Sequence, residues 1–153
     1  MSLLKSIQDG EGKTVEFKVE LPNSNTLAKT IIAFSNTGGG KLIIGVNDQG
    51  EIIGLEPDVN IFELKDKVAS IIYETCYPTV LPDIYTTTID DQLLLIIEVY
   101  RGNLLPYYLK NKGKNEGVYI RVGATNRKAS HENILELERQ RMNISFDQEA
   151  NRE

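Results

Sequence analysis

Three acidic residues in the first third of the chain have the types and spacing that suit metal chemistry. Glu11 and Glu16 flank the start of a segment with strand character, and Asp48 follows an apolar run of strand length. If the two strands are neighbours, the three carboxylates converge, and such oxygen ligands bind Mg²⁺ or Mn²⁺. Lys18 shares the strand face of Glu16, where it would neutralise the acids or contact a phosphate. The alternative is that the three acids are unrelated: Glu11 caps a loop, Glu16 faces the solvent from its strand, and Asp48 is an ordinary turn residue.

A run of glycines, Gly38, Gly39 and Gly40, is the second candidate site, with Lys41 directly after it. A helix must reverse into a strand here, so we expect at least one of these glycines to have a positive φ. Leu42 stands where a Walker A motif has Ser or Thr, and the run precedes a strand, so the sequence does not predict ATP binding. The backbone amides of the bend and Lys41 are instead expected to contact a phosphate of nucleic acid.

Charge is distributed unevenly along the chain. Residues 1–100 hold 7 lysines, no arginine and 15 acidic residues, whereas residues 101–141 hold 9 basic and 4 acidic residues. The formal net charge of −5 argues against indiscriminate nucleic-acid binding, but the basic segment permits a local contact face. The residues of this segment expected to contact nucleic acid are Lys112, Lys114, Tyr119, Arg121, Arg127 and Lys128. The alternative to a contact face is an ordinary strand with polar outward residues, followed by a turn on the solvated surface.

The spacing of apolar residues predicts the elements that position these candidates. Helices are expected at 2–8, 24–36, 61–77 and 130–142, and strands at 14–20, 41–46, 51–54, 84–89, 92–100, 107–109 and 118–122. Strands arrive mostly as adjacent pairs, with helices between the groups. This order predicts an α+β domain with a mixed, mostly antiparallel sheet and helices packed on it in two layers. We expect the domain to span residues 1–142, and residues 143–153 to form a tail or linker.

Composition and the rare residues exclude several classes of protein. No apolar run approaches the roughly 20 residues that a membrane span needs, and the N-terminus has no signal-peptide pattern, which favours a cytoplasmic location. Cys76 is the only cysteine and His131 the only histidine, so neither an intrachain disulfide nor a zinc site is expected.

Three ordered motifs together resemble one known family. EGKTVEFK at 11–18, AFSNTGGGKLIIGVNDQGEIIG at 33–54 and YIRVGATN at 119–126 are similar to the AlbA_2 domain of bacterial regulators and Schlafen proteins. The resemblance covers roughly residues 10–130. It implies the AlbA_2 fold and binding of DNA or RNA by the N-terminal module of a bacterial transcription regulator.

The Schlafen branch of the family implies a second function. There a Glu-x4-Glu pair and a later Asp form a metal-dependent RNA-cleaving site, which Glu11, Glu16 and Asp48 match in this chain. Two such lobes clamp RNA in that branch, so a single lobe would need to form a homodimer. The sequence therefore predicts a nucleic-acid-binding domain. The alternatives are a metal-dependent endoribonuclease using Mg²⁺ or Mn²⁺ and an oligomerisation module.

Overall fold

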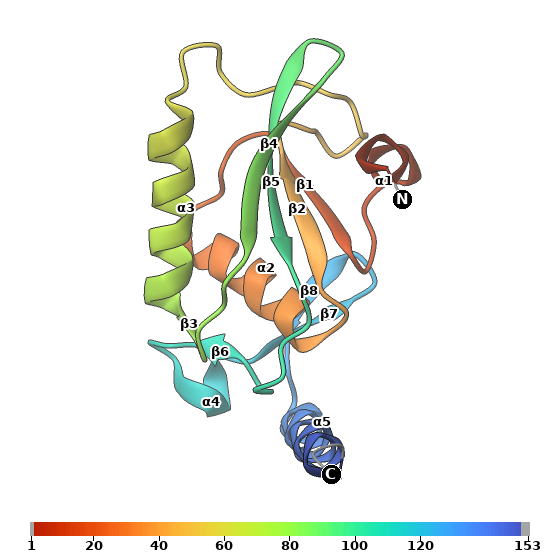
Figure 1. Ribbon diagram of the computed structural model, residues 1–153, viewed down its shortest axis with the longest axis vertical. Coiled ribbons are helices and arrows are strands. Elements are labelled where there is room, and N and C mark those ends of the chain that lie inside the picture. The colour runs from red at the N-terminus through yellow and green to blue at the C-terminus, as the bar shows by residue number, and fades with distance from the viewer. Residues whose placement is uncertain (1, 151–153) are drawn as a thin grey trace.

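The computed structural model describes residues 2–150, and the side chains up to residue 144. Its elements are α1 (Leu3–Asp9), β1 (Val15–Lys18), α2 (Ser24–Asn36), β2 (Gly40–Ile44), α3 (Ile61–Thr75), β3 (Cys76–Tyr77), β4 (Asp83–Ile89), β5 (Gln92–Val99), β6 (Tyr108–Leu109), α4 (Gly113–Glu116), β7 (Tyr119–Val122), β8 (Thr125–Lys128) and α5 (His131–Ala150). Helices and strands mix as expected for an α+β domain (Figure 1). Within residues 2–150, no helix has the length and apolar character needed to cross a membrane.

The main sheet has four strands in the order β1-β2-β5-β4. Strands β1 and β2 are parallel, because α2 carries the chain from the end of one back to the start of the other. The pairs β2–β5 and β5–β4 are antiparallel, so the sheet is mixed and mostly antiparallel, as the sequence predicts. The turn at Asp90 and Asp91, both with positive φ, joins β4 to β5.

Both faces of the sheet are covered near its centre. Helices α2 and α3 pack on one face over Leu42, Leu95 and Ile97, and α1 covers part of the other face near Ile43 and Ile96. All of these side chains are fully buried. The run LLLIIEV in β5 is apolar except for Glu98, because this central strand contributes side chains to the clusters on both faces of the sheet.

Strand β1 alternates as the sequence predicts, but its polar side does not face water. Phe17 points to the face of α1, whereas Glu16 pairs with Leu42 and therefore points to the face of α2. Glu16 is only 7% exposed. The polar side of this strand thus lies under the helical layer, where a carboxylate needs partners.

Two small sheets, β3–β6 and β7–β8, lie beside α2 (Figure 1). Asn36, at the end of α2, connects them to the core. Its Nδ2 donates to the carbonyls of Tyr107 at 2.8 Å and Tyr119 at 2.9 Å, and its Oδ1 accepts from the Tyr107 amide at 2.7 Å. Because Asn36 is buried, these three bonds fix β7 and the residue that precedes β6 against the helix end.

Four expectations about elements are corrected by the structure. Residues 51–54 form only an isolated bridge between Val46 and Ile52 rather than a strand. The strands expected at 107–109 and 118–122 are adjacent in the sequence but share only one bridge, because β6 pairs with β3 and β7 with β8. Residues 123–129 lie outside the expected strands, yet they contain β8. Helix α5 continues to Ala150, past the expected end near Met142, and residues 151–153 of the expected tail lie outside the described residues.

Candidate nucleic-acid interface

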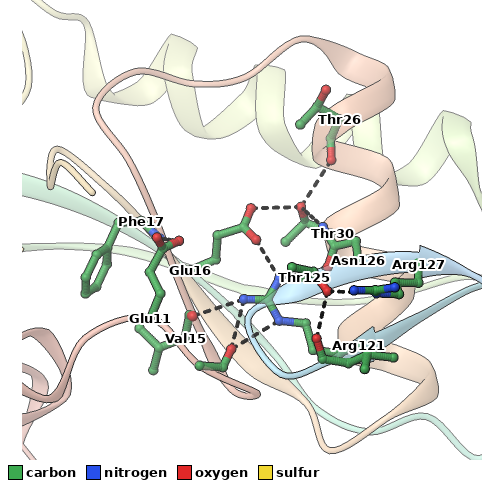
Figure 2. A network of polar contacts seen from close by, with 12 residues as sticks. Glu11, Val15, Glu16, Phe17, Thr26, Thr30, Arg121, Thr125, Asn126 and Arg127 are labelled. Carbon is green, nitrogen blue, oxygen red and sulfur yellow. Dashed lines mark hydrogen bonds and ion pairs between the residues drawn. The ribbon is translucent and has the colours of Figure 1, made fainter. Parts of the chain in front are cut away.

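The first feature of the site is a buried ion pair between Glu16 and Arg121 (Figure 2). Arg121 Nη1 donates to Glu16 Oε1 at 2.5 Å, and the Thr30 hydroxyl of α2 donates to Glu16 Oε2 at 3.2 Å. Asn126 of β8 completes the network, since its Oδ1 accepts from Arg121 Nη1 at 2.8 Å and its Nδ2 donates to Thr30 Oγ1 at 2.9 Å. Both carboxylate oxygens of Glu16 are therefore engaged inside the protein.

The remaining donors of Arg121 attach the β7–β8 hairpin to the start of β1. Nε and Nη2 donate to the Gly12 carbonyl at 3.1 and 2.9 Å, and Nη2 also donates to the Val15 carbonyl at 3.1 Å. The guanidinium lies 5.0 Å from the ring centroid of Phe34. Its side chain is 0% exposed, so the expectation that Arg121 contacts nucleic acid is wrong. The residue instead joins segments far apart in the sequence.

The three acids predicted to share a metal ion do not come together. Glu11 Oε2 accepts a bond of 3.0 Å from the Phe17 amide, Glu16 is held by Arg121, and Asp48 is exposed in a turn. In the part of the chain that the structure describes, no group of three or more His, Cys, Asp or Glu side chains could hold a metal ion. This corrects the prediction that Glu11, Glu16 and Asp48 together form a site for Mg²⁺ or Mn²⁺.

Lys18 also has a different environment from the one expected. The sequence offered it as the cation that neutralises Glu16, but the ion pair that Glu16 makes among the described residues is with Arg121. A guanidinium suits this position better than an ammonium, because its planar fork can bond a carboxylate and main-chain carbonyls together. Lys18 is half-buried at the end of β1 and stays a predicted phosphate contact.

The cations of the β7–β8 hairpin do not form one contact face. Lys128 pairs with Tyr119 across the hairpin and Arg127 pairs with Ile120, so the two cations project from opposite faces. Tyr119 was expected to stack on a base, but Lys29 Nζ lies 5.1 Å from the centroid of its ring. One face of that ring is therefore already covered by a cation.

Two further predicted contacts are partly neutralised by carboxylates. Lys114 forms an ion pair of 3.0 Å with Glu138, and Lys128 pairs with Glu116. The hydrogen bond and charge of Glu116 raise the pKa of Lys128, and Lys128 lowers the pKa of Glu116. Lys112 is exposed. Contact of Lys112 and of Arg127 with nucleic acid stays a prediction.

The structure confirms the prediction that at least one glycine of the bend has a positive φ. Gly39 has a φ of +74°, and a Cβ there would lie 2.7 Å from the Val99 carbonyl oxygen. A Cβ on Gly40 would lie 2.5 Å from the ring of Phe34. The bend is therefore free of side chains because β5 and the end of α2 approach it closely.

Two hollows meet at this bend, and cations from separate parts of the chain line them. The larger, of about 470 Å³, includes Lys13, Gly38 and Arg101, and extends along α5. The smaller, of about 250 Å³, includes Gly38, Lys41 and Arg101. Since Gly38 and Arg101 line both, the hollows form one continuous surface, which we call the glycine-bend groove.

The charge balance of the groove is positive. Within residues 2–144, Lys13, Lys41 and Arg101 make no ion pair, although Arg101 Nη2 donates to Gln140. Of the two carboxylates in the lining, Glu136 pairs with Arg139, and Glu98 belongs to the smaller hollow. The sequence pointed to Lys41 and the glycines but not to Lys13 or Arg101. The only signal for Arg101 was its position at the start of the basic segment.

A family profile matches most of the chain. The profile of the family described as Schlafen, AlbA_2 covers residues 11–130. This protein therefore belongs to the Schlafen AlbA_2 family, as its motifs indicate. No sequence among curated proteins matches the chain.

Two solved structures share the fold. The DIP2311 protein from Corynebacterium diphtheriae has 24% identity and a TM-score of 0.59, over 83% of this chain and 24% of that protein. The N-terminal domain of a DNA helicase RecG-related protein from Nitrosomonas europaea has 23% identity and a TM-score of 0.58, over 84% of this chain and 91% of that domain. The chain thus spans about a quarter of the first protein and nearly all of the second domain.

Proposed function

We propose that this domain binds nucleic acid through the glycine-bend groove, as part of a transcriptional regulator. One observation carries the proposal: Lys13, Lys41 and Arg101 line a single hollow surface around a turn that has no side chains. Ammonium and guanidinium groups without carboxylate partners attract a phosphate backbone, and a bare glycine turn lets that backbone approach closely. Membership of the Schlafen AlbA_2 family and the likeness to a domain of a DNA helicase RecG-related protein support the same function.

The groove suits this role better than the hairpin suggested by sequence. Lys114 and Lys128 are paired with carboxylates, and Arg121 is buried. An ion pair must be broken before such a cation can bind a phosphate. Lys13, Lys41 and Arg101 make no ion pair within residues 2–144, so they bind a phosphate without that cost. The homodimer expected from two-lobed relatives stays a prediction, which the molar mass measured in solution would test.

The test is a salt titration of binding with a matched charge control. We expect the double variant Lys13→Gln, Lys41→Gln to bind labelled DNA and RNA more weakly than wild type. The slope of log K against log salt should become shallower by about 0.7–0.9 for each phosphate that the variant no longer neutralises. Fluorescence anisotropy at several salt concentrations measures both quantities.

The control removes the same charge elsewhere. Lys65→Gln, Lys67→Gln on α3 lowers the net charge by the same amount but lies outside both hollows. We expect this variant to keep nearly the wild-type salt slope. Equal reductions in affinity and slope in the two double variants, or no binding by the wild-type protein, would refute the proposal.

A further inference from the structure

An exposed aromatic ring stands at one end of the glycine-bend groove. Tyr100 follows β5 directly, is 61% exposed and lines the smaller hollow together with Gly38 and Lys41. Its hydroxyl donates to Asp83 Oδ2 at 2.9 Å, which fixes the tip of the side chain. Arg101, the next residue, lines both hollows. A fixed, solvent-facing ring therefore stands beside Lys41 and Arg101, which make no ion pair within residues 2–144.

We infer that Tyr100 is a stacking platform for an unpaired base, so the ligand of the groove is single-stranded nucleic acid. This inference rests on the function proposed above and specifies its ligand. A cationic track beside an exposed aromatic ring is the arrangement that binds single strands, because every base has a π-face that can stack while its phosphate meets a cation. A base inside a duplex is already stacked on its neighbours and cannot reach the ring.

The charges around the ring also set the direction of the ligand. Glu98 lies directly opposite both Lys41 and Asp83 in the sheet, so a row of charged residues crosses β2, β5 and β4. Phosphates are attracted to the Lys41 side of this row and repelled from the Asp83 side. The carboxylates can accept hydrogen bonds from the amino or imino groups of a base. The base therefore lies over Tyr100 toward Asp83, and its phosphate lies toward Lys41 and Arg101.

Two other tyrosines do not combine a free ring face with a place in the glycine-bend groove. Tyr119, which the sequence selected for stacking, has Lys29 over its ring. Tyr73 is 66% exposed, but it lies on α3 in a hollow lined mainly by apolar residues, and Lys110 Nζ lies 5.9 Å from the centroid of its ring. Tyr73 is therefore a matched control: an exposed tyrosine outside the glycine-bend groove.

The chain contains no tryptophan, so one introduced tryptophan reports its own surroundings. We would prepare Tyr100→Trp and Tyr73→Trp and titrate each with a 12-nucleotide oligothymidylate, a 12-nucleotide oligouridylate and a 12-base-pair DNA duplex. Single strands should quench the indole fluorescence of Tyr100→Trp and leave that of Tyr73→Trp nearly unchanged. The duplex should quench neither. In anisotropy measurements, Tyr100→Leu should weaken single-strand binding roughly tenfold, and Tyr73→Leu should not.

The possible outcomes separate this inference from the proposed function. If wild type binds the duplex as tightly as the single strands, or single strands bind without selective quenching of Tyr100→Trp, the stacking inference is wrong while nucleic-acid binding stands. If wild type binds none of the three ligands, both fail. Selective quenching together with weaker binding by Tyr100→Leu supports the inference.

Discussion

Removing the guanidinium of Arg121 should be among the most damaging single changes in this domain. In Arg121→Met, Glu16 keeps the Thr30 hydrogen bond but loses its counter-ion while it remains buried. The carbonyls of Gly12 and Val15 lose their Arg121 donors at the same time. Methionine fills much of the volume, so the change tests the charge and the hydrogen bonds more than the packing.

The magnitude follows from the burial of the pair. Breaking a buried ion pair by removing one partner costs about 3–5 kcal/mol, because an uncompensated charge stays in the interior. Domains of this size are stable by only about 5–15 kcal/mol, so Arg121→Met should lose a large fraction of the free energy of unfolding. Adding Glu16→Gln removes the uncompensated charge, and the double variant should recover about 1–3 kcal/mol relative to Arg121→Met.

Urea denaturation followed by circular dichroism measures these free energies. Arg139→Met is the control, because Arg139 pairs with Glu136 on the surface, where the side chains are 65% and 50% exposed. That change should cost no more than about 1 kcal/mol. If Arg121→Met cost as little as Arg139→Met, or if Glu16→Gln made it still less stable, the idea that this pair holds the hairpin to β1 would be refuted.

Two further predictions concern the bend and the buried thiol. Gly39→Ala should destabilise the domain by more than about 1 kcal/mol, because of its positive φ and the 2.7 Å approach of Cβ to the Val99 oxygen. Gly38→Ala meets nothing within 4 Å and should be nearly neutral in the same urea titration; equal costs would contradict the reasoning. Burial raises the pKa of the Cys76 thiol from 9.0 to about 11. At pH 8 the native protein should therefore react far more slowly with iodoacetamide than the urea-unfolded chain, since the thiolate is the nucleophile; equal rates would show that the thiol is accessible. The stability that the thiol contributes is present below a pH of 9.0 and is lost as the pH rises through about 11.

Much of the fold could be predicted from the sequence because its signals are local. Asn23 caps α2 through a 2.9 Å bond to the Thr26 amide, and Ser130 caps α5 through a 3.1 Å bond to the Asn133 amide. The apolar run of β5 indicates a strand covered on both faces, and the glycine run indicates the turn at Gly39. The motifs at 11–18, 33–54 and 119–126 suffice to identify the family.

Tertiary structure decided what the local signals leave open. The first example is whether Glu16 is buried and which cation pairs with it. Alternation with period two shows which residues of β1 share a face, but not whether water or a helix covers that face. The counter-ion of Glu16 lies 105 residues further along the chain, and no local pattern specifies a contact of that separation.

The groove depends on tertiary structure for the same reason. Lys13, Lys41 and Arg101 come from a loop, from β2 and from the segment after β5, and they meet because β1, β2 and β5 are neighbours in the sheet. The sequence therefore determined most of the elements and the family. The packing of those elements decided that Arg121 is buried as a partner for Glu16, and that Arg101 and Tyr100 face the solvent beside the glycine bend. A charged side chain can bind a ligand if it is exposed, and it can stabilise the core if it is buried beside a partner. Which of the two occurs depends on residues distant in the sequence, because these residues pack over the side chain.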